Sequence, residues 1–266
     1  MDRIGLIAGN RRFPLIFCEA AARHGVKVTA AAIKGETSRG ICRLAEKVRW
    51  LTLAEYESVF DYFLKEGIKD VVMAGQISPR SLFSPQVTNS KAIQELLNSI
   101  KDNKANTIFG AIARQLADRG LKLIDSTTFL KDFVPQKGVL TGRQPSEAEW
   151  KDLNFGMDLA KNVAGLDIGL TVAVKNRAIV AVEALEGTDN LILRAGRICK
   201  KLAIAKAARP DQDMRFDIPV MGLNTVKTLI RANVACMAIE AGKTLIIDMK
   251  PALKLADKKG ISIAAL

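Results

Sequence analysis

The strongest constraint on the fold is the alternation of short apolar runs with amphipathic segments through the first half of the chain. Strands that alternate with helices in this way predict a parallel sheet with helices on its faces, as in a Rossmann-like domain. The predicted strands are residues 4–8, 26–33, 70–74 and 121–124, and the predicted helices are residues 15–23, 52–64, 91–100 and 106–119.

Glycines follow two of these predicted strands: Gly9 precedes Asn10 after the first, and Gly75 precedes Gln76 after the third. The carboxyl ends of parallel strands meet at one edge of a sheet, where ligands bind in such folds. We therefore predict that these four residues bind substrate. The chain contains neither GxGxxG nor GxxxxGK[ST], which disfavours a nicotinamide cofactor and a P-loop.

A break in periodicity divides the chain into two parts. Residues 133–145 contain two prolines and two glycines and show no helical or strand pattern, which indicates a linker. The sequence therefore predicts a Rossmann-like N-terminal domain at residues 1–132 and a C-terminal domain at residues 146–266.

The C-terminal domain is predicted to be α/β or α+β, with its strand order left open. Ser146 and Glu149 form a capping box that opens a helix, and a hairpin follows. The predicted helices are residues 147–164, 189–196, 225–235 and 251–258, and the predicted strands are residues 170–174, 178–182, 202–205 and 244–247.

The residue inventory excludes several kinds of catalysis. The one histidine, His24, lies at the predicted end of the first helix, where we expect it to cap that helix. Cysteines at positions 18, 42, 199 and 236 are far apart and lack zinc spacing, so we expect reduced, packed thiols. Serine triads, Cys-His pairs and zinc centres are therefore disfavoured. Any metal would need oxygen ligands, which favours Mg²⁺ or Mn²⁺.

The chain is basic, with a net charge of +12, which predicts an anionic partner. That partner is a phosphorylated metabolite, an acidic membrane surface or a nucleic acid. Aromatic residues make up 5% of the chain and the basic residues form no dense tract, so nucleic acid is disfavoured.

No apolar run reaches the length of a membrane span and the first residues do not resemble a signal peptide, which predicts a cytoplasmic protein.

Acidic residues gather in the segment VEALEGTDN, which contains Glu183, Glu186 and Asp189. Gly187 permits a sharp turn there, and Thr188 is predicted to cap the following helix. Taken by themselves, these residues are typical of a capped turn with solvated acids.

A second acidic position, Asp217, lies between apolar residues in RFDIPVMG. A carboxylate in that setting is expected to be partly desolvated and to need a cation, a metal or a proton. An N-terminal cap of the next element is the alternative interpretation.

Five segments together resemble the UDP-2,3-diacylglucosamine pyrophosphatase family of lipid A biosynthesis, the type unrelated to metallophosphatase-like enzymes. They are GLIAGN, VVMAGQIS, LDIGLTVAVKNRAIVAVEALEGTD, LAIAKAARPDQDMRFDIPVMGLNT and AGKTLIIDM, and they span nearly the whole chain in order. The resemblance implies a Mg²⁺-dependent hydrolase that directs water to the α-phosphate, giving UMP and 2,3-diacylglucosamine 1-phosphate (lipid X). It also implies a homodimer in which substrate lies between the two domains.

The same resemblance implies roles for individual residues. Asp217 matches the essential aspartate of the family and is predicted to be catalytic. Where relatives carry an acidic run, this chain reads KDNKANT, so Lys104 and Asn106 are candidates for phosphate or ribose contact. The implied metal ligands are Asp217, Asp189 and Glu183, and the remaining implied substrate contacts are Glu186, Gly187, Thr188, Asp189, Lys206 and Thr225.

Two other functions compete with this enzyme. A nucleotide-binding or sugar-phosphate-binding module without catalysis would use the glycine turns alone. An RNA-binding protein would show affinity that falls steeply with salt. A diacylated substrate favours the enzyme at the inner-membrane surface, since excess Lys and Arg is attracted to an anionic leaflet.

Overall fold

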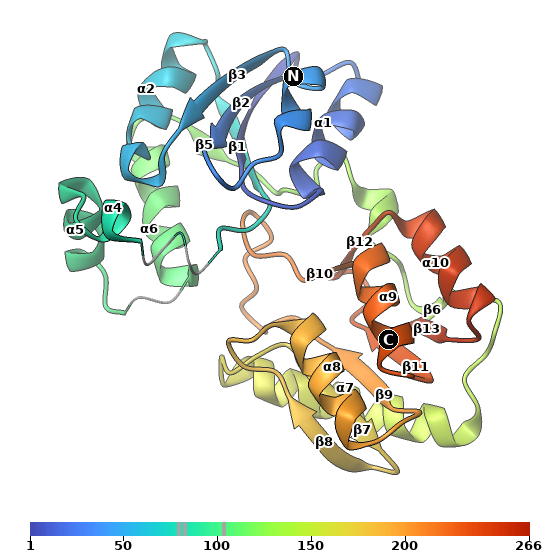
Figure 1. The fold of residues 1–266 in the computed structure, drawn as a ribbon. Helices are drawn as coiled ribbons and strands as arrows, with labels where there is room; N and C mark the ends of the chain where they lie inside the picture. The colour runs from blue at the N-terminus through green and yellow to red at the C-terminus, as the bar shows by residue number, and fades with distance from the viewer. Residues whose placement is uncertain (79–80, 82–83, 103–104) are drawn as a thin grey trace. The chain divides into compact units, whose positions relative to one another are not determined.

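The protein is described here by a computed structural model that covers residues 1–78, 81, 84–102 and 105–266 (Figure 1). The chain forms two compact units. One contains Met1–Leu130 together with Asp213–Asp217, and the other contains Lys131–Gln212 together with Ile218–Leu266. Among the described residues, no helix combines the length and the hydrophobicity needed to span a bilayer.

The first unit is built on a five-stranded sheet with the order β3-β2-β1-β4-β5, and every pairing in it is parallel. This confirms the predicted Rossmann-like architecture. Its strands are β1 (Arg3–Ala8), β2 (Lys27–Ile33), β3 (Lys47–Leu51), β4 (Asp70–Ala74) and β5 (Lys122–Leu123).

Helices cover both faces of this sheet (Figure 1). One face packs against α1, which contacts β2 and β4. The other face carries a cluster of buried side chains that includes the apolar faces of α2 and α6. The helices of the unit in the described residues are α1 (Phe13–Arg23), α2 (Ser58–Lys65), α4 (Pro85–Thr88), α5 (Lys91–Asn98) and α6 (Ala105–Asp118), with 3₁₀ turns η1 (Arg39–Arg43) and η2 (Leu53–Glu55).

The predicted caps of the first unit are only partly confirmed. The Nδ1 of His24 lies 2.9 Å from the carbonyl oxygen of Ala20, so the only histidine of the chain caps α1 as expected. Thr52 and Glu55 do form a capping box, but it opens the short 3₁₀ turn η2. The α-helix begins later, at Ser58.

The second unit contains a six-stranded mixed sheet with the order β6-β13-β11-β9-β7-β8. Strands β9, β11 and β13 run parallel, whereas β6, β7 and β8 pair antiparallel with their neighbours. The strands are β6 (Gly138–Val139), β7 (Thr171–Lys175), β8 (Ala178–Val182), β9 (Ala203–Lys206), β11 (Cys236–Ile239) and β13 (Ser262–Ala265), and β10 (Val220–Gly222) pairs separately with β12 (Leu245–Ile247).

One face of this sheet packs against α7 (Glu147–Gly165), and the other packs against α8 (Thr188–Ile198), α9 (Leu223–Arg231) and α10 (Met249–Lys258). The Ser146–Glu149 capping box opens α7 as predicted. Within the segment predicted as a linker, β6 pairs with β13, and the 3₁₀ turn η3 (Lys131–Phe133) precedes it.

The hairpin of β7 and β8 is held by a buried carboxylate. Asn176 and Arg177 have φ angles of 51° and 57°, which are left-handed conformations that twist the turn to match its strands. Their backbone N–H groups donate to the two oxygens of Asp152, at 2.9 and 2.7 Å. The predicted turn is therefore confirmed, and its support comes from a helix 24 residues earlier in the chain.

Asp213–Asp217 belongs to the first unit by its contacts, although it lies within the C-terminal domain predicted from the sequence. The carbonyl oxygen of Met214 accepts hydrogen bonds from the backbone N–H and the hydroxyl of Ser126, at 3.2 and 2.9 Å. The ring of Phe216 packs on that of Phe109, with centroids 6.0 Å apart. Thus Asp217 is placed by the first unit.

The cysteines are all free thiols, as predicted. Cys18 lies in α1 and Cys236 in β11, and burial raises the pKa of each thiol to about 12. Cys42 is exposed and Cys199 is partly exposed.

Candidate functional site

A polar cluster lies at the carboxyl edge of the sheet in the second unit. Strand β9 ends at Lys206, Glu183 directly follows β8, and Thr171 begins the strand between them. Because β8 and β9 run in the same direction on either side of β7, their carboxyl ends meet at one edge. Thr188 and Asp189 approach this edge from the first turn of α8.

Lys206 is the centre of this cluster, and its side chain is almost completely buried. Its Nζ donates to the Thr188 hydroxyl at 2.8 Å, and that hydroxyl donates to Oε1 of Glu183 at 3.1 Å. The hydroxyl of Thr171 lies 3.2 Å from that of Thr188. Lysine, two threonines and an acid therefore form one hydrogen-bonded group.

Burial lowers the pKa of Lys206, and the negative charges of Glu183 and Asp189 oppose that shift. A buried ammonium remains charged only if anions compensate for its lost hydration. An ammonium also carries three N–H donors, so Lys206 retains capacity for an anionic ligand beyond its bond to Thr188.

Two carboxylate oxygens of the cluster lack a hydrogen-bond donor among the described residues. They are Oε2 of Glu183 and Oδ1 of Asp189, and both atoms are buried. Buried acceptors without donors indicate a place for an ion or a proton. Hard oxygen donors of this kind fit Mg²⁺, which proteins bind through one or two carboxylates together with substrate phosphates.

The structure leaves the third predicted metal ligand, Asp217, in the other unit. Among the described residues, no group of three or more His, Cys, Asp or Glu side chains is arranged to hold a metal. The predicted ligand set therefore stays a prediction, and the second unit by itself contributes the pair Glu183 and Asp189.

The turn before α8 differs in detail from the prediction. Gly187 has a φ of 81°, which confirms the sharp turn, but Gly187 itself is the N-cap and Thr188 is the first helical residue. The Thr188 hydroxyl is used by Lys206 instead of capping the helix. Glu186 turns outward, where Arg194 donates to it and lowers the pKa of its carboxyl.

Three other predicted contacts are not joined to the cluster. Thr225 is buried in the first turn of α9, and no described hydrogen bond links it to Lys206. Lys104 lies outside the described residues. Asn106 is described only as part of the backbone of α6.

In the first unit, the turns that follow β1 and β4 contact each other, as their strand positions predicted. The N–H groups of Gly9 and Asn10 donate to the carbonyl oxygens of Ala74 and Gln76, at 2.8 and 2.7 Å. A Cβ atom on Gly9 or on Gly75 would lie within 2.6 Å of backbone atoms of the other turn, so both positions need glycine. These two N–H groups are used inside the unit, which removes them as donors to a phosphate.

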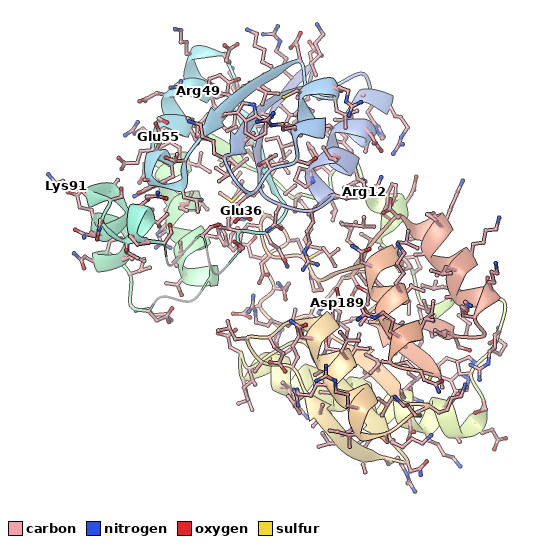
Figure 2. The ribbon with its side chains drawn as sticks, viewed as in Figure 1. Arg12, Glu36, Arg49, Glu55, Lys91 and Asp189 are labelled. Carbon is pink, nitrogen blue, oxygen red and sulfur yellow. The ribbon has the colours of Figure 1, made fainter. Side chains whose placement is uncertain are left out.

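Glu36 is a polar residue of this edge that the sequence analysis missed. Figure 2 labels Glu36 among the side chains of this unit. Its carboxylate accepts from Asn10 Nδ2 at 2.6 Å, from the N–H and hydroxyl of Ser78 at 3.2 and 2.6 Å, and from the Ser81 hydroxyl. It follows β2, so its place at the carboxyl edge was a signal available in the sequence. Glu36 therefore connects the loop that follows β2 with those that follow β1 and β4. Its carboxylate oxygens already accept hydrogen bonds from protein groups.

The Glu36 network predicts an acid-sensitive contribution to stability. Burial alone would raise the pKa of Glu36, but the hydrogen bonds from Ser78, Ser81 and Asn10 outweigh burial and lower it below 4.5. A lowered pKa means that the ionised carboxylate stabilises the fold above pH 4.5 and that this contribution is lost as pH falls through the folded pKa. Glu36→Gln, which cannot accept from all four donors, is expected to cost about 2 kcal/mol at neutral pH.

The measurement is urea unfolding followed by Trp50 fluorescence in a Trp150→Phe background, because each unit contains one tryptophan. The stability gap between parent and Glu36→Gln should be constant above about pH 5 and narrow below pH 4.5. A gap that does not change between about pH 3 and pH 7 would contradict this role.

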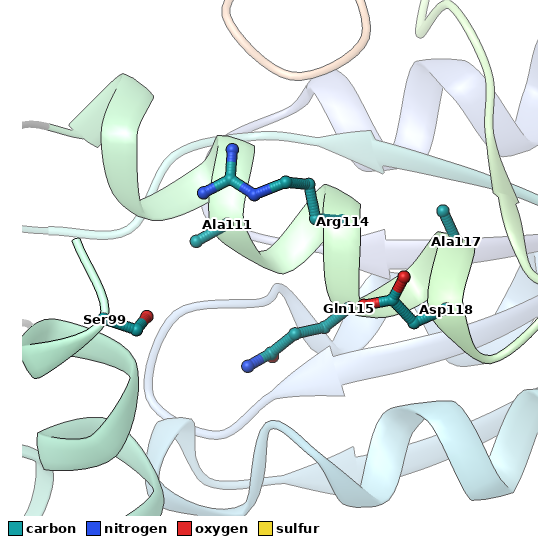
Figure 3. Close-up of a pocket in the computed structure, with 6 residues that line it drawn as sticks. All are labelled: Ser99, Ala111, Arg114, Gln115, Ala117 and Asp118. Carbon is teal, nitrogen blue, oxygen red and sulfur yellow. The ribbon is translucent and has the colours of Figure 1, made fainter.

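A separate pocket of about 350 Å³ lies on α6 (Figure 3). None of the residues that line it was predicted as a site residue. They are Ser99, Ala111, Arg114, Gln115, Ala117 and Asp118.

Solved structures resemble this chain only weakly. The biotin carboxylase domain of Hydrogenobacter thermophilus 2-oxoglutarate carboxylase is 14% identical with a TM-score of 0.30, covering 66% of this chain and 35% of that chain. N5-carboxyaminoimidazole ribonucleotide synthetase from Thermus thermophilus is 17% identical with a TM-score of 0.27, covering 71% and 44%. The chain spans less than half the length of either structure, and such low scores support no argument about function.

Comparison of the sequence with known proteins gives a more specific match than comparison with solved structures. UDP-2,3-diacylglucosamine pyrophosphatase LpxI from Caulobacter vibrioides is 26% identical over 279 residues, covering 99% of this chain and 97% of that protein. The model of the LpxI N-terminal domain matches residues 3–133, and that of the LpxI C-terminal domain matches residues 136–264. Since both domains are matched in order along the chain, this protein belongs to the LpxI family.

Proposed function

We propose that this chain hydrolyses the diphosphate of UDP-2,3-diacylglucosamine in lipid A biosynthesis. The observation that carries the proposal is the full-length match to a pyrophosphatase of that name, with both domains in order. In the reaction, the oxygen of water bonds to the uridine-side phosphorus and the bond from that phosphorus to the bridging oxygen breaks. The products are UMP and 2,3-diacylglucosamine 1-phosphate.

The Lys206 cluster supports this chemistry. Cleavage of a diphosphate places negative charge on the leaving phosphate, and a fixed cation in a dry site stabilises that charge more than it would in water. Lys206 supplies such a cation, held by Thr188 at 2.8 Å. The negative charges of Glu183 and Asp189 favour the charged form of the ammonium and oppose the effect of burial on its pKa.

A divalent cation would be held by the oxygens of Glu183 and Asp189 that lack donors, and when bound it would neutralise charge on the phosphate oxygens. We propose Mg²⁺, with Mn²⁺ as a substitute, because the donors are hard oxygens. Asp217 is proposed as the catalytic carboxylate, either as a further metal ligand or as the group that orients water. A homodimer and a peripheral location at the cytoplasmic face of the inner membrane complete the proposal.

The reaction is tested with substrate in neutral detergent and water enriched in ¹⁸O. The label is expected in UMP and not in the lipid product, as measured by mass spectrometry. Label in the lipid phosphate would mean attack on the other phosphorus. Binding without product would favour a non-catalytic binding protein.

Metal dependence is tested on the same reaction. EDTA is expected to abolish turnover, and Mg²⁺ or Mn²⁺ in excess over the chelator is expected to restore it, because the oxygens of Glu183 and Asp189 that lack donors are hard ligands. Full activity in EDTA would contradict the proposed role of Glu183 and Asp189.

A further inference from the structure

The outer surface of the helical layer formed by α8, α9 and α10 is basic. These three helices contain seven basic and two acidic residues, a net charge of +5. One of the seven, Arg194, pairs with Glu186. The other six are exposed, and in the described part of the chain none of them forms an ion pair: they are Arg197, Lys227, Arg231, Lys250, Lys254 and Lys258. We call these six residues the basic face.

The opposite face of the same sheet has the opposite charge. Its one helix, α7, contains four acidic and two basic residues, a net charge of −2. Both layers belong to one compact unit, so the charge difference is set by the fold of that unit alone. Among the helices of this unit, the excess of positive charge therefore lies on one side of the C-terminal sheet.

Helix packing concentrates this charge. Gly196 of α8 lies so close to Ala232, at the end of α9, that a Cβ atom on it would be 2.7 Å from the alanine Cβ. Lys227 and Arg231 are one helical turn apart, and Lys250, Lys254 and Lys258 repeat at the same spacing. Like charges at this spacing repel and destabilise a helix, so the arrangement has a cost that an anionic partner would relieve.

We propose that the basic face binds anionic phospholipid head groups and holds the C-terminal unit on a bilayer. The choice of a lipid surface rests on the proposed function, since a diacylated substrate resides in a membrane. The basic face contains no aromatic residue on any of its three helices, so it offers no stacking platform for nucleic acid bases. Ile198, 63% exposed at the end of α8, adds an apolar contact at the head-group boundary.

The test is sedimentation of the purified protein with vesicles of phosphatidylglycerol and phosphatidylethanolamine, compared with vesicles of phosphatidylcholine alone. The double variant Lys227→Glu/Lys254→Glu is expected to lower the partition coefficient on anionic vesicles by at least about ten-fold. The matched control is Lys151→Glu/Lys161→Glu on α7, which makes the same change in net charge on the opposite face and is expected to bind normally. All four positions are exposed, and equal thermal unfolding of the variants would verify their folding.

Three results would overturn the proposal. They are equal loss of binding in the two double variants, equal binding of the parent to neutral and anionic vesicles, and preference of the parent for RNA over anionic vesicles at the same ionic strength. Hydrolysis of substrate in neutral detergent separates this inference from the proposed function. A basic-face variant should hydrolyse substrate in detergent at the rate of the parent protein. If the parent protein itself does not hydrolyse substrate in detergent, the proposed function is refuted, whereas its binding to anionic vesicles is unaffected by that result.

Discussion

Lys206→Met is expected to lower kcat by about 10²–10³-fold, because it removes a fixed cation from the place where phosphate charge develops. Methionine matches the length of the lysine stem and leaves the buried volume nearly unchanged. The matched control is Lys175→Met, at the opposite end of the neighbouring strand, where Nζ bonds to the carbonyl oxygen of Lys201. That variant should keep normal turnover.

Lys206→Met will also lower stability, since the buried Glu183 and the partly buried Asp189 would be left without a compensating cation. Adding Glu183→Gln removes one of these charges and is expected to recover stability in urea unfolding without recovering kcat. Recovery of both quantities would show that Lys206 acts only through the fold. Normal kcat in Lys206→Met alone would remove it from the mechanism.

In the unsubstituted protein, the pH profile of kcat should also reflect the charge of Lys206. Burial lowers the pKa of Lys206, so its ammonium is lost at a lower pH than that of an exposed lysine. The kcat profile is therefore expected to fall on the alkaline side below the usual lysine range. This alkaline limb should be absent from the residual activity of Lys206→Met.

Asp217→Ala is the second substitution with a large expected effect. We expect it to fold and to bind substrate but to lose most turnover, by about 10³-fold or more, because a group that positions water or metal acts mainly in the transition state. Asp213, four residues earlier, is the matched control, since its carboxylate is paired with Arg215. Asp213→Ala should keep most turnover, and near-normal kcat in Asp217→Ala would exclude the residue from catalysis.

Asp217→Asn separates the two roles left open for this carboxylate. If Asp217 is a metal ligand, the Mg²⁺ concentration for half-maximal rate should rise and excess Mg²⁺ should recover part of the rate. If it orients water, kcat should fall without a change in Mg²⁺ dependence. Calorimetric titration with Mg²⁺ measures its affinity independently, and this affinity should fall in Asp217→Asn if Asp217 is a metal ligand.

The architecture of the first unit was predictable because each of its predicted strands is a short apolar run that is followed by a glycine or a charged residue. Gly9 and Gly75 mark the ends of two adjacent parallel strands, and the structure brings their turns into backbone contact. In contrast, β3 was missed although its residues KVRWL alternate between charged and apolar. Two of its five residues are charged, so it lacks the continuous apolar run by which the other strands of this unit were predicted.

The second unit was harder to predict for a different reason. Strands β11 and β13 are buried on both faces, so they lack the alternation that identifies a strand. β13 is also rich in alanine, which has low strand propensity. The apolar residues just before β11 continue the pattern of α9, and the predicted helix ran to residue 235 whereas the helix ends at Arg231.

Site residues were predictable where one segment contains them. Glu183, Thr188 and Asp189 lie within seven residues of one another, and the structure brings Lys206 to them; their roles in catalysis and binding stay predictions. The position of Glu36 after β2 was visible in the sequence, but its network was missed because its partners, Ser78 and Ser81, lie more than 40 residues later. No local pattern in a sequence records such a contact.

The two buried cysteines have a practical consequence, since each unit contains one of them. A thiol whose pKa is raised to about 12 is present almost entirely as the unreactive protonated form, and burial also shields it from reagents. In a Cys42→Ser/Cys199→Ser background, Cys18 and Cys236 would react with a maleimide only when the unit that contains them unfolds. Mass spectrometry of the two labelled peptides would then give the unfolding rate of each unit separately, within a single sample.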